Sequence, residues 1–128
     1  MSNTTKVITA LAAVAETTTS NKFYVGGAKR IGLLFRRTNH GSGSSTFTVN
    51  GGMESEDTVT PTMTALSMLI TNTANSNVQN LIRVASVALV SNTDALVWLD
   101  SVCLLNWISI TATEVTDGNH TAFILLEY

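Results

Sequence analysis

The sequence predicts an all-β fold: a single-domain antiparallel β-sandwich of the jelly-roll type, with about eight strands and an extended N-terminal segment. Apolar and polar residues alternate with a period of two in several segments, which is the pattern of strands with one buried face. The polar residues are mostly threonine, serine and asparagine, and threonine favours strands. At 128 residues the chain is long enough for one core, whereas two separate cores would each be too small.

The first half of the chain contains the clearest strand pattern. Residues 1–20 form either an extended arm or a first strand, and residues 21–128 form the sandwich domain. Residues 21–25 are expected to be a short strand that a glycine pair ends. Residues 29–52 predict two strands joined as a hairpin by a loop rich in glycine and serine. The apolar faces of these two strands carry Ile31, Leu33, Phe35, Phe47 and Val49.

The middle of the chain is less regular, and the second half returns to strands. Pro61 argues against a central strand near it, and Thr62–Ile70 fits either a short helical turn or an edge strand. Alternation resumes over residues 81–90. Further strands are expected within residues 95–100, 102–115 and 121–128, and a hairpin turn is expected at residues 116–119.

Several of the late strands are apolar on both faces, although a sandwich strand needs only one buried face. Loops, the segment 1–20 or a neighbouring subunit would have to cover the second face, and of these we expect the neighbouring subunit, so that the protein forms an oligomer. The side chains that suggest this are Trp98 beside Val97 and Leu99, Trp107 beside Ile108, and Phe123 beside Ile124.

The charge content and the lengths of the apolar runs argue against two classes of partner. Charged residues make up 12% of the chain and the net charge is −2, so we expect no nucleic-acid partner. No apolar run approaches the ~20 residues that span a bilayer, so we expect no membrane partner. With Cys103 as the single cysteine, no disulfide forms within the chain, which suits synthesis in a reducing cytoplasm.

No motif in the sequence predicts catalysis, a cofactor or a metal site, so we expect no enzyme. His40 and His120 fall in segments expected to be loops, lie far apart in sequence and have no ligand beside them. Each is therefore expected to be a solvated histidine. A triad drawn from Ser45, His40 and Asp57 has no support, because a serine-rich chain offers many such choices.

Three segments of the chain resemble small β-sandwich proteins of tailed-phage virions. They are FYVGGAKRIGLLFRR, SGSSTFTVNGGMES and NWISITATEVTDGNHTAFILLEY. Proteins of this kind show an amphipathic strand, a Gly/Ser loop, a strand similar to ATFTVEGS and a late ending W-x-x-I-x-x-T…G…A-x-I-x-L. The counterparts here are Ser45–Asn50, Trp107–Thr113 and Ala122–Leu126, whereas GGMESED stands where the family has an acidic-glycine turn.

The resemblance implies a capsid decoration, or cement, protein of a tailed bacteriophage. Such a protein is made in the host cytoplasm, sits on the outer capsid surface of the virion and clamps neighbouring major capsid proteins, often as a dimer or trimer. The residues expected at its protein interfaces are Lys6, Val7, Ile8, Arg30, Arg36, Arg37, Trp98 and Trp107.

Two other functions stay open from the sequence. The chain resembles a virion part in general, so a head-fibre base or a tail component also fits. A carbohydrate-binding β-sandwich is the other alternative, because aromatic side chains on a sheet face stack on sugar rings. The candidates for that stacking are Tyr24, Trp98 and Trp107.

Overall fold

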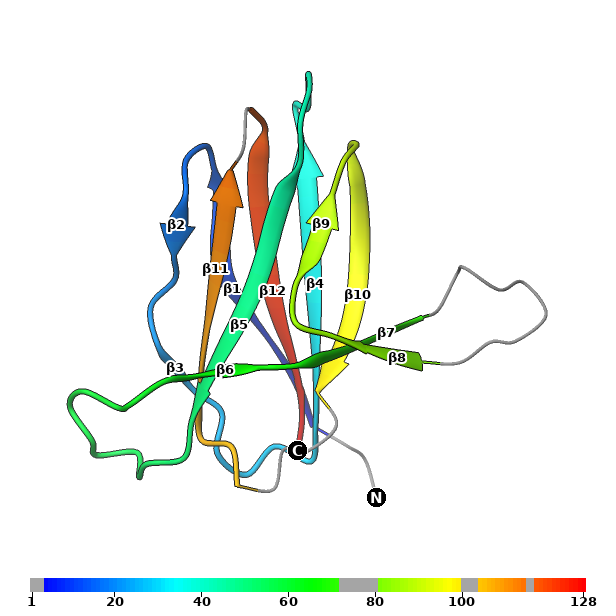
Figure 1. The fold of residues 1–128 in the computed structure, drawn as a ribbon. Helices are drawn as coiled ribbons and strands as arrows, with labels where there is room; N and C mark the ends of the chain where they lie inside the picture. Colours follow the sequence, from blue (N-terminus) through cyan, green and yellow to red (C-terminus); the bar gives the residue numbers. More distant parts are fainter. Residues whose placement is uncertain (1–3, 72–80, 100–103, 115–116) are drawn as a thin grey trace.

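The computed structural model describes residues 4–71, 81–99, 104–114 and 117–128, and these residues form two antiparallel sheets packed face to face (Figure 1). Cys103 lies outside the described residues. None of the described residues lies in a helix, so these ranges contain no helix able to cross a membrane. The strands in these ranges are β1 (Thr5–Val14), β2 (Thr18–Thr19), β3 (Phe23–Tyr24), β4 (Arg30–Thr38), β5 (Ser45–Gly52), β6 (Thr64–Leu66), β7 (Met68–Thr71), β8 (Leu81–Val84), β9 (Val87–Leu89), β10 (Thr93–Leu99), β11 (Trp107–Glu114) and β12 (Asn119–Glu127).

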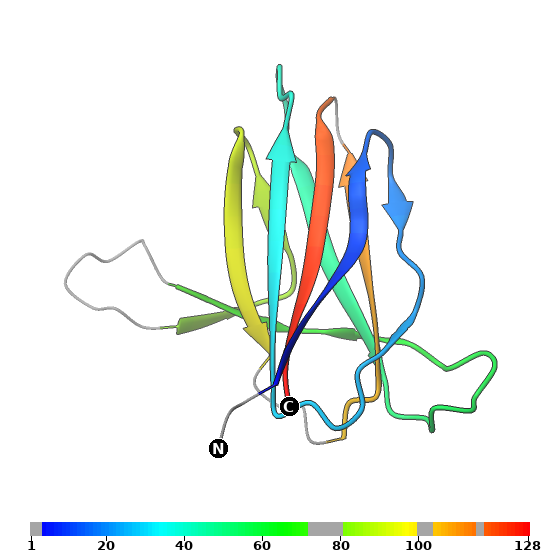
Figure 2. The ribbon, with the colours of Figure 1, turned by 180° about the vertical axis from the view of Figure 1, so that it is seen from behind.

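The sandwich that the sequence predicts is present, and its strand order, which the sequence left open, is that of a jelly roll. Sheet A has the order β1-β12-β4-β10-β7-β8. Sheet B has the order β2-β11-β5-β6, with β3 also paired to β11 and β9 also paired to β5. Each of the connections β4–β5, β9–β10 and β11–β12 passes from one sheet to the other, which is how a jelly roll winds. Figure 2 shows sheet A in front.

Residues 29–52 do not form the hairpin that the sequence predicts. They contain β4 and β5, which lie in opposite sheets and face each other across the core. Phe35 of β4 stacks on Phe47 of β5, with ring centroids 4.7 Å apart and planes 9° apart. The alternation identifies the buried face of each strand correctly, but a buried face does not reveal which strand is the hydrogen-bonded neighbour. The expected hairpin turn at residues 116–119 is wrong for the same reason, because β11 and β12 are also in opposite sheets.

Two segments that the sequence left open form strands. In the N-terminal segment, β1 pairs with β12 from Thr5↔Glu127 to Val14↔His120 and forms one edge of sheet A. Within Thr62–Ile70, β6 pairs with β5, and β7 pairs with β10 through Leu69 and Trp98. The chain therefore crosses from sheet B to sheet A between β6 and β7, and β8 forms the other edge of sheet A (Figures 1 and 2).

Candidate protein interface

The outer face of sheet A carries an apolar band over its central strands. The residues of β4 that point outward alternate with the buried Ile31, Leu33 and Phe35. The pairing register then aligns the outward residues of neighbouring strands in rows across the sheet. One row holds Val7, Leu125, Gly32, Trp98 and Leu69, and the next holds Thr9, Phe123, Leu34 and Leu96.

Several of these apolar side chains are exposed to solvent. Val7 is 62% exposed, Leu96 42% and Trp98 37%. All three lie on the face of sheet A that points away from the core, so packing within the monomer does not bury them. We call this surface, with the rows given above, the apolar face of sheet A.

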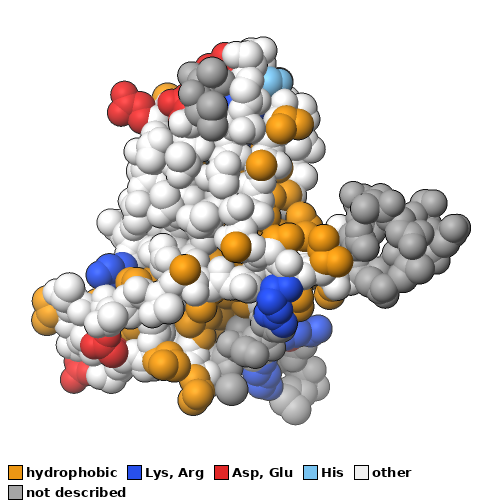
Figure 3. All heavy atoms as spheres, in the orientation of Figure 1, with side chains coloured by type: hydrophobic (Ala, Val, Ile, Leu, Met, Phe, Trp, Pro, Cys, Tyr) orange, Lys and Arg blue, Asp and Glu red, His pale blue; other side chains and the backbone are white. Residues whose placement is uncertain are grey.

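The outer face of sheet B has the opposite composition. Thr111 and Thr48 are paired neighbours, and Thr113 and Thr46 are paired neighbours in the next row. The Thr111 hydroxyl also hydrogen-bonds to that of Thr19 at 2.9 Å. Figure 3 looks onto this side, where the upper part is mostly white and the orange side chains gather lower down and on the right, beside β7 and β8. A sheet face in contact with water normally carries polar side chains. The outer face of sheet B does so, whereas the outer face of sheet A carries apolar ones.

One ion pair lies at each end of the apolar face of sheet A. Arg30 donates two hydrogen bonds to the Glu127 carboxylate, at 2.6 and 2.8 Å. Arg36 donates two to Asp94, at 2.9 and 3.0 Å, and its guanidinium lies 5.9 Å from the ring centroid of Phe123. The Arg36 hydrogen bonds lower the pKa of Asp94. Both ends are therefore neutral, and the face carries no unpaired charge from these four groups.

A hollow in the apolar face lies over Gly32, in the middle of β4. It has a volume of about 380 Å³, and Val7, Leu96, Trp98 and Leu125 are among the residues around it. A Cβ added at Gly32 would lie 3.6 Å from the Val97 carbonyl oxygen, which is an ordinary contact. Glycine weakens a strand and is not required here by its neighbours, so its effect is to leave the surface open.

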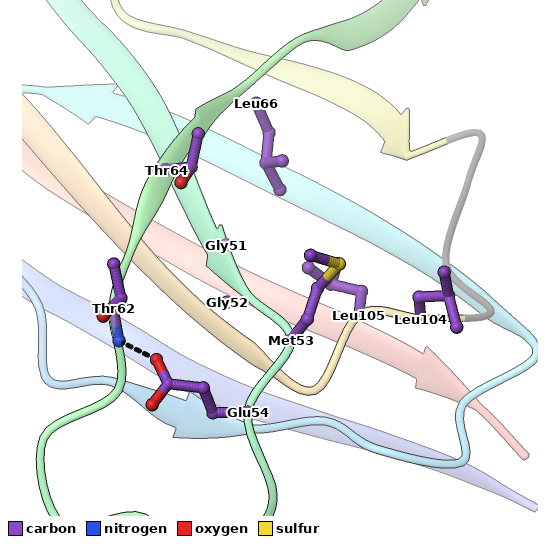
Figure 4. Close-up of a pocket in the computed structure, with 9 residues that line it drawn as sticks. All are labelled: Gly51, Gly52, Met53, Glu54, Thr62, Thr64, Leu66, Leu104 and Leu105. Atoms are coloured by element: carbon purple, nitrogen blue, oxygen red, sulfur yellow. Dashed lines mark hydrogen bonds between the residues drawn. The ribbon is translucent and has the colours of Figure 1, made fainter.

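A second apolar hollow lies at the end of β5 (Figure 4). Gly51 and Gly52 form its floor, and the side chains of Met53 and Leu104 stand at its rim, each 69% exposed. Its volume is about 380 Å³. Glu54 accepts a hydrogen bond of 2.5 Å from the Thr62 backbone N–H, which ties the two ends of the β5–β6 connection together. The remaining lining residues are Thr64, Leu66 and Leu105.

Four of the predicted interface residues lie together, and the others lie elsewhere. Val7, Arg30, Arg36 and Trp98 come together on the apolar face of sheet A. Lys6 and Ile8 pair with the inward residues Leu126 and Ile124, so they point to the other side of β1. Trp107 lies in β11 of sheet B, where its ring contacts Tyr24 edge to face and its Nε1–H donates to the Glu54 carbonyl at 3.0 Å.

Arg37 is not a surface residue, and its expected place at an interface is wrong. Its side chain is 0% exposed and lies among loop carbonyl oxygens at one end of the sandwich. It donates hydrogen bonds of 2.9 Å each to the carbonyls of Ser42, Gly43 and Leu89, and it also contacts the Asp117 carbonyl. The sequence pattern did indicate that Arg37 is buried, because it continues the inward-facing series of Ile31, Leu33 and Phe35 at every second residue.

His120 is likewise buried rather than solvated. It lies in β12, with its Nε2 2.5 Å from the Ser45 hydroxyl and its Nδ1 2.9 Å from the Val14 carbonyl. The carbonyl accepts from Nδ1–H, so Nε2 accepts from the serine. Both side chains are inside the core, where the hydrogen bonds hold β1, β5 and β12 together. Across the described ranges, no group of three or more His, Cys, Asp or Glu residues is arranged to hold a metal ion.

Comparison with known proteins finds a match in fold. The crystal structure of the SPBc2 prophage-derived protein YomS matches with a TM-score of 0.71 and 16% sequence identity, over 100% of this chain and 96% of that one. The likeness shows that the two chains share a fold along their whole length. No protein-family model and no curated protein matches the sequence.

Proposed function

We propose that the protein is a structural component of a phage particle, which decorates the outer capsid surface and stabilises it by binding neighbouring major capsid proteins. An exposed apolar hollow carries the proposal. At the end of β5, Met53 and Leu104 are each 69% exposed beside a hollow whose floor is Gly51 and Gly52. Contiguous apolar surface on a small domain is typical of a protein contact. The shared fold with a prophage-derived protein supports a phage origin.

The action proposed here is binding without chemistry. The hollow at Gly51 accepts an aliphatic side chain of a shell subunit between Met53 and Leu104. The lining of the hollow carries little charge, so removing water from it costs little free energy when a partner binds. One hollow of this size supports only weak attachment, and repetition over a capsid lattice multiplies weak contacts into stable coverage.

Electron microscopy of the particles tests the proposal. Phage particles from a host culture that carries this gene are purified and labelled with gold-conjugated antibody against the protein. Label spread over the heads is the expected result. Particles without label, and without the chain by mass spectrometry, would overturn the proposal. Label confined to the tail or to head fibres would replace it with another virion part.

A binding assay with matched variants locates the contact. Purified protein is sedimented with shells assembled from the major capsid protein of the same phage and lacking this chain. Met53→Asp places a charge at the rim of the hollow and should abolish co-sedimentation. The control Thr113→Asp places the same charge on the exposed face of sheet B and should leave it intact. Specific glycan binding with no shell binding would favour the carbohydrate-binding alternative.

A further inference from the structure

We propose that the protein forms a two-fold symmetric dimer through the apolar face of sheet A, with Leu34 of each copy seated over Gly32 of the other. The dimer goes beyond the proposed capsid function and does not depend on it, because it concerns two copies of this chain alone. Its basis is the shape, the apolar pattern and the charge of this one face.

The shape of the face is complementary to itself. Gly32 leaves a hollow, and the half-buried Leu34 points outward from the same strand two residues away. A two-fold axis that lies between the two copies, perpendicular to β4 and level with residue 33, exchanges these two positions. Each leucine then faces the hollow of the other copy, so a projection and a cavity meet at two equivalent places. Symmetric interfaces of this type use the same patch on both subunits.

The same axis matches apolar residues along the neighbouring strands. The row of Gly32 in one copy faces the row of Leu34 in the other. On β12 this sets Leu125 against Phe123 of the second copy, and on β10 it sets Trp98 against Leu96. A tryptophan near the centre of a contact is typical of the residues that dominate binding energy.

The charges at the two ends are compatible with this arrangement. The axis brings the Arg30–Glu127 pair of one copy to the end that holds Arg36–Asp94 in the other. This sets Arg30 of one copy opposite Arg36 of the other on β4, with Glu127 and Asp94 on the flanking strands β12 and β10. Each end is neutral as a whole, because each arginine keeps its own carboxylate, and the two facing arginines weaken the contact without leaving a net charge in it.

The area of the face suits a reversible dimer. Five strands at about 4.8 Å and three row intervals of about 6.8 Å give roughly 480 Å² per copy, or about 1,000 Å² in total. This is close to the lower limit of about 1,000 Å² for a specific interface, which is the size of weak and transient contacts, so we expect a reversible dimer with a dissociation constant of about micromolar or weaker. A second copy is favoured over an unrelated partner because the hollow and its matching projection are both present on one chain.

Analytical ultracentrifugation of the isolated protein tests the dimer. Between about 1 µM and about 1 mM the mass should rise from 13.6 kDa toward twice that value, since this range brackets a micromolar constant. Leu34→Ala removes the projection and should weaken dimerisation at least about tenfold. Gly32→Val fills the hollow and should weaken it about 100-fold, while the melting temperature stays the same or rises because valine favours strands. This thermal readout separates loss of dimer from loss of fold.

A swap of the two residues provides the decisive variant. Gly32→Leu combined with Leu34→Gly exchanges the projection and the hollow, and the two-fold axis makes the swapped face self-complementary again. The double variant should regain dimerisation that Gly32→Leu alone loses. A wild-type protein that stays at 13.6 kDa up to about 1 mM would overturn the proposal. A dimer unaffected by both Leu34→Ala and Gly32→Val would overturn it equally, because it must use another surface.

Discussion

Replacement of Arg37 by alanine should be among the most destabilising single changes in this protein. The guanidinium is fully buried and hydrogen-bonds to carbonyl oxygens of the β4–β5 loop, of Leu89 in β9 and of Asp117 before β12. These segments come from both sheets, so one side chain fixes the relative position of three chain connections. Without it, the Leu89 carbonyl is left buried without its donor, and the partly buried carbonyls of the two loops lose theirs.

The expected loss follows from the number and kind of these bonds. Hydrogen bonds that involve a charged group contribute about 1.5–3 kcal/mol each, and water that enters the cavity replaces part of them. Breaking a buried charged group away from its partners typically costs about 3–5 kcal/mol. We therefore expect Arg37→Ala to lower the free energy of unfolding by about 3–5 kcal/mol, since no other cation replaces the guanidinium. Arg37→Lys should recover only part, because an ammonium group has no planar fork with which to reach several carbonyls.

Arg36→Ala is the matched control in the neighbouring position. Arg36 points outward and pairs with Asp94 in solvent, where such an ion pair contributes about 0–1 kcal/mol. Urea denaturation followed by circular dichroism, at one protein concentration, gives both values. Equal effects of the two alanine variants, or an effect of Arg37→Ala below about 1 kcal/mol, would show that the buried hydrogen bonds do not stabilise the fold as argued.

Three further predictions concern the core, the glycines and pH. Ser45→Ala should cost about 1–3 kcal/mol in urea denaturation, because it leaves the buried His120 Nε2 without its donor. Gly52→Ala should destabilise by about 1–3 kcal/mol, since its Cβ would lie 2.8 Å from a backbone carbonyl oxygen of the β5–β6 loop, whereas Gly32→Ala should stabilise by about 0.5–1 kcal/mol. Backbone hydrogen bonds from the β4–β5 loop lower the pKa of Asp117, so its stabilising effect is complete above the ordinary aspartate pKa of about 3.9 and is lost as pH falls through the lowered value. The protection of the loop amides against hydrogen exchange, relative to the intrinsic exchange rate at each pH, should therefore fall over this acidic range.

Each of these has a contrary outcome. An unchanged midpoint for Ser45→Ala would mean that another group satisfies the histidine nitrogen. Equal stability changes for the two glycine variants would contradict the difference in space around them. Loop amides that exchange at the same rate in wild type and in Asp117→Asn, at both neutral and acidic pH, would show that the carboxylate does not hold the loop.

Particular residues show how far sequence reasoning reaches in this protein. Ile31, Leu33, Phe35, Phe47 and Val49 are all buried, as their alternation predicts. The same alternation places Arg37 inside, but its charge suggested the surface, and charge was the poorer guide. A fully buried arginine requires several carbonyl acceptors converging on it. Those acceptors lie on segments far apart in the sequence, so no local pattern announces them.

The apolar face was partly predictable and partly not. Trp98 and Phe123 stood out because their strands are apolar on both sides. Gly32 did not stand out, because nothing in the sequence around a single glycine in a strand indicates that it lies at the floor of a hollow. The hollow exists only because β12 and β10 flank β4, which brings Leu125 and Trp98 to either side of it.

The sequence by itself determined that this chain forms strands, which face of each long strand is buried, and that the fold is a β-sandwich. These are local properties, since side-chain alternation along a strand depends only on backbone geometry. Only the tertiary structure decided which strands are neighbours, that β4 and β5 face each other across the core, and that apolar residues from separate strands align on sheet A. Strand pairing is set by contacts between segments distant in sequence, and those contacts create the surface on which the proposed binding depends.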